Sequence, residues 1–135
     1  MILLDTHGLV WVRVEPAKLS PKAREAIRVA RQGDGVAISA ITLWRLARLA
    51  THGRLHVNGT IDAFVEKIAS TIAIRSITTQ IAVLANQLAS TYPGDPSDRL
   101  IGATAMSKGI ALVTKDRAIR NYKQIRTIWY GQVSA

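Results

Sequence analysis

Three aspartates occupy comparable places in the sequence, each next to an apolar run or at the start of a helical pattern. Asp5 directly follows the apolar residues 1–4, and Asp116 comes just after the apolar residues 110–113. Asp98 falls in the first turn of a predicted helix. Carboxylates that gather at one place repel each other unless a cation neutralises them, and oxygen ligands alone select Mg²⁺ or Mn²⁺ over zinc. The three acids therefore point to a divalent-metal site.

Each aspartate also has a purely structural explanation. Asp5 fits the cap of the turn that follows it, and Asp116 fits the cap of a short helix. Asp98 stands three residues after Asp95, as in an acidic version of a capping box. These explanations treat the acids one by one and do not account for their shared position, so we favour the metal site.

The surrounding sequence alternates short apolar runs with amphipathic helical patterns. Continuous apolar runs between helices indicate a parallel sheet covered on both faces. Right-handed crossovers then place the carboxyl ends of all strands at one edge, where ligands bind in such sheets. The expected strands are residues 1–4, 36–39, 72–77, 110–113 and 125–129, and the expected helices are residues 7–12, 21–32, 43–50, 61–68, 79–88, 96–108 and 117–122.

Composition favours a single folded domain over residues 1–135, with the last few residues as a loose tail. The chain is 48% hydrophobic and contains no cysteine, which excludes disulfides, thiolate zinc sites and a thiol nucleophile. The first residues lack a basic leader and include the acid Asp5, and no stretch has the length of a membrane span. We expect a cytoplasmic protein without a membrane partner.

Charge is the most informative bulk property. The chain has 18 Lys and Arg against 9 Asp and Glu, a net charge of +9. Such an excess favours a polyanionic partner, either nucleic acid or an acidic protein segment. Aromatic residues make up only 5% of the chain, which argues against an extended stacking platform for single strands.

Five segments, taken in chain order, resemble those of a known family. They are residues Leu3-Leu4-Asp5-Thr6-His7, Ala37-Ile38-Ser39-Ala40-Ile41-Thr42-Leu43-Trp44, Asp95-Pro96-Ser97-Asp98-Arg99-Leu100-Ile101, Leu112-Val113-Thr114-Lys115-Asp116 and Arg126-Thr127-Ile128-Trp129. Together they span nearly the whole chain and resemble PIN-domain proteins of the VapC toxin type. The ordered set is specific, although no single motif would be.

The resemblance implies a three-layer α/β/α sandwich with a mainly parallel central sheet. It also implies an endoribonuclease that depends on Mg²⁺ or Mn²⁺, a homodimer, and a cognate antitoxin whose tail covers the active site. By motif position, Asp5, Asp98 and Asp116 match the acids of the family's catalytic metal site.

One position departs from the family pattern. Where that pattern continues Leu-Trp-Glu, this sequence has Leu43-Trp44-Arg45. A guanidinium cannot ligate a metal ion, and close to one it weakens binding by like-charge repulsion. Three explanations follow: natural loss of activity, an engineered change that silences a toxic enzyme, or a working site in which Arg45 holds a phosphate. A fourth places Arg45 in solvent beside Arg48.

Neighbouring residues have possible supporting roles. We expect the hydroxyls of Thr6 and Thr114 to orient the adjacent carboxylates, although each could instead bond locally. Arg99, Lys115 and Arg117, with Arg120 as a further candidate, lie near the expected site and could steer an RNA backbone, although a solvated surface role is at least as common.

Two other function classes compete with the nuclease. The first is a catalytically silent PIN-like dimer that binds RNA or an antitoxin, which metal-dependent cleavage abolished by Asp98→Ala would exclude. The second is a phosphotransferase with Asp5 as nucleophile. Phosphatases of that kind place a second Asp two residues later, where this sequence has His7.

Overall fold

The computed structural model describes residues 1–130, which form a five-stranded sheet in the order β3-β2-β1-β4-β5. Every strand pairing is parallel. The strands are β1 (Ile2–Leu4), β2 (Val36–Ser39), β3 (Ala73–Arg75), β4 (Ala111–Val113) and β5 (Thr127–Ile128). The predicted parallel sheet is confirmed. The predicted loose tail lies outside the described residues.

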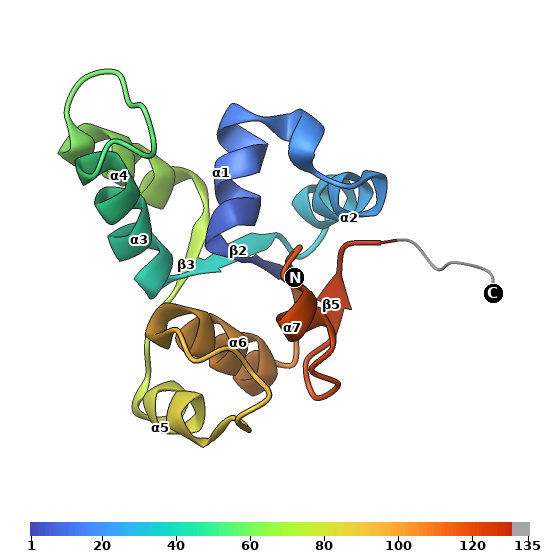
Figure 1. Ribbon diagram of the computed structural model, residues 1–135. Coiled ribbons are helices and arrows are strands. Elements are labelled where there is room, and N and C mark those ends of the chain that lie inside the picture. The colour runs from blue at the N-terminus through green and yellow to red at the C-terminus, as the bar shows by residue number, and fades with distance from the viewer. Residues whose placement is uncertain (131–135) are drawn as a thin grey trace.

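Helices cover both faces of this sheet (Figure 1). They are α1 (Thr6–Val14), the short 3₁₀ helix η1 (Pro16–Lys18), α2 (Pro21–Gln32), α3 (Ala40–Thr51), α4 (Ile61–Thr71), α5 (Thr79–Gln87), α6 (Pro96–Lys108) and α7 (Arg117–Arg120). The predicted three-layer α/β/α class is confirmed. No helix within residues 1–130 is both long and apolar enough to cross a membrane.

Alternation along the strands divides the core into two. Leu4, Ile38 and Val113 face a cluster that includes buried side chains of α1 to α4. Their neighbours Leu3, Ala37 and Leu112 face the opposite cluster, which is built largely by α6 and the segment around α7. Because successive side chains of a strand point to opposite faces, three-residue strands are long enough to serve both layers.

The three central strands are in register near their carboxyl ends. Leu4 of β1 pairs with Ile38 of β2 on one side and with Val113 of β4 on the other. The backbone N–H of Asp5 then donates to the Val113 carbonyl, at 3.1 Å. This register brings the residues that follow β1, β2 and β4 to one edge of the sheet.

The observed elements differ from the predicted ones mainly at their ends. α1 begins at Thr6 and extends to Val14, beyond the predicted residues 7–12. β3 and β5 are shorter than the predicted residues 72–77 and 125–129, because each is an edge strand with one neighbour to pair with.

α6 is packed as its small side chains predict. Residues 101–105 in its middle are all buried. A Cβ added at Gly102 would lie only 2.3 Å from the Tyr92 hydroxyl, so glycine is needed for this close approach. That hydroxyl donates to the Asp98 carbonyl at 2.7 Å, which ties the loop before α6 to its first turn.

Candidate active site

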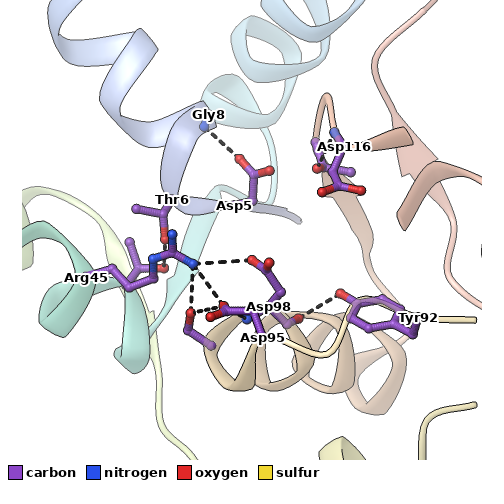
Figure 2. A network of polar contacts seen from close by, with 11 residues as sticks. Asp5, Thr6, Gly8, Arg45, Tyr92, Asp95, Asp98 and Asp116 are labelled. Carbon is purple, nitrogen blue, oxygen red and sulfur yellow. Dashed lines mark hydrogen bonds and ion pairs between the residues drawn. The ribbon is translucent and has the colours of Figure 1, made fainter. Parts of the chain in front are cut away.

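Two of the three aspartates cap helices. Asp5 is the N-cap of α1, and its Oδ1 accepts from the Gly8 N–H at 2.7 Å. Asp116 is the N-cap of α7, and its Oδ1 accepts from the Ile119 N–H at 3.0 Å. The bond from Gly8 to Asp5 is drawn in Figure 2. Capping fixes the direction of each carboxylate, since one oxygen is held by the helix backbone.

Asp98 is positioned by the start of α6. Asp95 caps this helix, and its Oδ2 accepts from the Asp98 N–H at 3.0 Å. The Asp98 side chain is therefore not used as the cap, and Figure 2 shows it turned toward the space between Asp5 and Arg45. The structural explanation therefore holds for Asp5 and Asp116, whereas the Asp98 carboxylate accepts no capping hydrogen bond within the described residues.

All three aspartates line one pocket at the carboxyl edge of the sheet. Its volume is about 450 Å³, and its wall contains the side chains of Asp5, His7, Trp11, Arg45, Asp98, Lys115, Asp116 and Ile119. Across residues 1–130, however, no three His, Cys, Asp or Glu side chains converge closely enough to hold one metal ion in this conformation. The pocket collects the acids without drawing them into a closed ligand cage.

Burial dominates the electrostatics of Asp5. Loss of solvent raises the pKa of this carboxyl, whereas the Thr114 hydroxyl and the Gly8 N–H lower it in part. Nearby Asp116 raises the pKa further, since two negative charges disfavour each other.

The pKa of Asp98 is also raised by burial and by neighbouring acids. Burial and then the neighbouring Asp95 raise its pKa to about 6, against the attraction of Arg45. Asp116 and Asp5 add smaller increases. A site in which carboxylates raise one another's pKa favours an added cation, and three carboxylates without sulfur ligands fit Mg²⁺ or Mn²⁺.

Arg45 supplies a cation of the protein's own. It extends from α3, and its Nη1 donates to Ser97 Oγ at 2.7 Å, Asp95 Oδ2 at 3.1 Å and Asp98 Oδ1 at 3.4 Å (Figure 2). Its side chain is only 22% exposed. The alternative that Arg45 points into solvent beside Arg48 is therefore wrong, because α3 turns this side chain toward the first turn of α6.

The two threonines near the acids differ. Thr6 is buried, and its hydroxyl lies 3.3 Å from that of Thr42, so it bonds to a second threonine rather than to a carboxylate. Thr114 accepts from the Asp116 N–H at 3.1 Å and also lowers the pKa of Asp5. Of the two, Thr114 is the one that links acids of the pocket.

The basic residues near the acids differ in whether they line the pocket. Lys115 lines the pocket, whereas Arg117 is exposed outside its wall. The expectation that Arg99 steers an RNA backbone needs a correction. Its guanidinium donates to the backbone carbonyls of Ala85 and Leu88 around the end of α5. Free carbonyls at a helix end attract cations, so Arg99 is held there and not presented to RNA.

Three residues of this region were not assigned a role from the sequence. Ser97 anchors Arg45, and His7 and Trp11 stand in the pocket wall. The sequence partly indicated His7 and Trp11. They lie four residues apart in the helix that Asp5 caps, so both side chains fall on the same face of that helix. The Ser97 contact gave no signal, since it joins positions 52 residues apart.

Comparison with known proteins finds a matching family model and a similar protein that covers nearly the whole chain. A family model for the PIN domain matches residues 2–125. Ribonuclease VapC22 of Mycobacterium tuberculosis is 39% identical over 130 residues, which cover 95% of this chain and 98% of that protein.

Solved structures give the same picture. DNA-bound VapBC from Salmonella typhimurium matches with a TM-score of 0.70 and 25% identity, covering 94% of this chain and 97% of that chain. VapBC2 from Rickettsia felis, bound to a DNA fragment from its promoter, matches with a TM-score of 0.72 and the same coverage. At 16% identity the latter likeness shows the fold alone.

Proposed function

The chain belongs to the PIN-domain family, and on this premise we propose that it is a ribonuclease toxin of a toxin–antitoxin pair. Its reaction is the metal-dependent cleavage of RNA phosphodiesters. The observation that carries the proposal is the gathering of Asp5, Asp98 and Asp116 in one pocket at the carboxyl edge of the sheet. The 39% identity with Ribonuclease VapC22 over nearly all of both chains supports it.

The same three aspartates would hold Mg²⁺ or Mn²⁺. A bound ion offsets the charge of the phosphodiester, lowers the pKa of a water and stabilises the leaving oxygen. Asp5 and Asp116 enter this role with their directions fixed by capping. Lys115, in the same pocket, is placed to attract the RNA backbone, and Arg117 lies just outside it.

Arg45 weakens this site in our proposal. Its Nη1 occupies one side of Asp98 and neutralises part of the charge that a metal ion requires. Natural loss of activity and engineered silencing both agree with this contact between Arg45 and Asp98, because both require a weakened metal site. A phosphate-holding role would use the donors of the Arg45 guanidinium other than Nη1, which is the nitrogen that contacts Asp98. The 39% identity with Ribonuclease VapC22 favours the nuclease over the silent dimer. The phosphotransferase gains no support from the pocket, where Asp5 Oδ1 is already used as a cap.

Partners follow from the relatives. The similar structures from Salmonella typhimurium and Rickettsia felis are VapBC assemblies, so we propose a cognate antitoxin for this chain. RNA as substrate, a homodimer and a cytoplasmic location complete the proposal. The net charge of +9 agrees with RNA or an acidic antitoxin segment as a partner.

The decisive test measures cleavage of RNA by the purified chain with Mn²⁺ and with excess EDTA. Cleavage that requires Mn²⁺ and is lost in Asp98→Asn supports the proposal. Asp62→Asn is the matched control, because Asp62 also lies in the first turn of a helix, α4, but is exposed. Cleavage that persists in Asp98→Asn would show that the nuclease site lies elsewhere.

A further inference from the structure

A second hollow adjoins the candidate active site along α3. It has a volume of about 730 Å³, and its wall includes Trp44, Arg48, His52 and Arg54. We call it the α3 groove. Neither the aspartates nor the pocket around them requires these four side chains.

The α3 groove is positively charged. Arg48 and Arg54 are exposed, and among residues 1–130 neither forms an ion pair with an acid. The acid in the groove wall is Asp95, which is engaged by Arg45 and Ser97. Because these two exposed arginines are not paired with an acid in the described part of the chain, they favour an anionic ligand such as a phosphodiester.

The groove also presents an aromatic ring. Trp44 is 55% exposed, although large apolar side chains tend to be buried. The Arg48 guanidinium carbon lies 5.5 Å from the Trp44 ring centroid, a cation–π contact that holds both groups at the groove. Tryptophan and arginine side by side are the groups on which unpaired bases of RNA stack. A single tryptophan makes a subsite for one base, which agrees with the low aromatic content.

Arg45 connects the α3 groove to the candidate active site. It lines both hollows, so a strand whose phosphate reaches Asp98 passes directly from one to the other. We infer that the α3 groove binds a nucleotide of single-stranded RNA next to the cleaved phosphate. The base stacks on Trp44, and Arg48 and Arg54 contact the flanking phosphates. This inference rests on the proposed function.

The test measures RNA binding without cleavage. A fluorescent single-stranded oligoribonucleotide is titrated in EDTA, and its anisotropy reports affinity. We expect Trp44→Ala to weaken binding roughly tenfold and Trp44→Phe to restore most of the loss. Arg54→Ala should lower the salt slope of log affinity by about 0.7, the value for one phosphate contact to a single strand.

Arg31→Ala is the matched control, because Arg31 is exposed on α2 and lines a different hollow. It should bind RNA like the unaltered chain. Thermal unfolding and light scattering of each variant establish its fold and oligomeric state. Arg54 is exposed, so its variant keeps the test valid if Trp44→Ala does not fold.

RNA affinity unchanged in both Trp44→Ala and Arg54→Ala would overturn the inference. A change of oligomeric state in Trp44→Ala with unchanged affinity would likewise overturn it and assign the groove to a protein interface. These outcomes are independent of the Mn²⁺ and Asp98→Asn experiment. The α3 groove can therefore fail as a subsite while the nuclease proposal stands, and a failure of the nuclease proposal is recognised separately by that experiment.

Discussion

The Arg45 guanidinium is tied to Asp98, with 3.4 Å between Nη1 and Oδ1. A cation from α3 thus contacts a carboxylate of the candidate metal site. It stands at the position where the family pattern has a glutamate. Because arginine stays charged at working pH, this contact persists wherever Asp98 is ionised.

Arg45→Glu should strengthen Mn²⁺ binding and raise RNA cleavage. The substitution removes a competing cation and adds a carboxylate oxygen near Asp98, so we expect at least a tenfold gain in affinity by titration calorimetry, about 1.4 kcal/mol. Arg48→Glu makes the same change in net charge one helical turn away and should bind Mn²⁺ almost as before. Equal Mn²⁺ affinity for Arg45→Glu and the unaltered chain would contradict the competition.

The pH dependence of stability should reflect Asp98. Its pKa of about 6 lies above the ordinary 3.8, so the folded chain takes up the proton more readily than the unfolded chain between these values. Stability without metal should therefore rise as the pH falls from 7 toward 5. Thermal unfolding measures this trend, which should be weaker in Asp98→Asn. Mn²⁺ affinity should change in the opposite direction, because protonated Asp98 cannot ligate a metal ion.

Asp116 should reveal its two roles through two substitutions. Asparagine still accepts the N–H of Ile119 and therefore keeps the cap of α7, whereas alanine loses it. Asp116→Ala should lower the free energy of unfolding by about 1 kcal/mol, and Asp116→Asn by much less. Both should reduce Mn²⁺-dependent cleavage. If Asp116→Asn retained full cleavage, capping would be the sole role of this residue.

Gly102→Ala should destabilise the fold. The new Cβ would lie 2.3 Å from the hydroxyl of Tyr92, which is buried and packs edge-on against Tyr122 with 5.2 Å between ring centroids. Relief of that clash moves a packed ring, at a cost of about 1–3 kcal/mol in urea unfolding. Gly94→Ala is the control, because its added Cβ meets no atom within 4 Å.

The sequence predicted the layout of the sheet well and its side-chain contacts less well. Continuous apolar runs before Asp5 and Asp116 were enough to place both acids at one edge, because parallel strands share the direction of their ends. The cap at Asp95 was likewise readable from local residue types. These features depend on neighbours within a few positions.

Contacts between distant segments were not readable. The reach of Arg45 to Ser97 depends on how closely α3 approaches α6, which no local pattern encodes. The placement of Arg99 on the carbonyls of α5 similarly depends on the packing of two helices. The ends of β3 and β5 were overestimated because apolar residues beside an edge strand need not pair with a neighbouring strand.

The use of Asp5 and Asp116 as caps limits how this chain can lose activity. A substitution at either position that removes the carboxylate oxygen also loosens a helix start, so inactivation there tends to reduce the amount of folded protein. Position 45 lies within α3 and caps nothing, so a change of charge there leaves the backbone intact. It is a site where the proposed activity can be tuned or lost while the folded chain, and the antitoxin binding proposed for it, is retained.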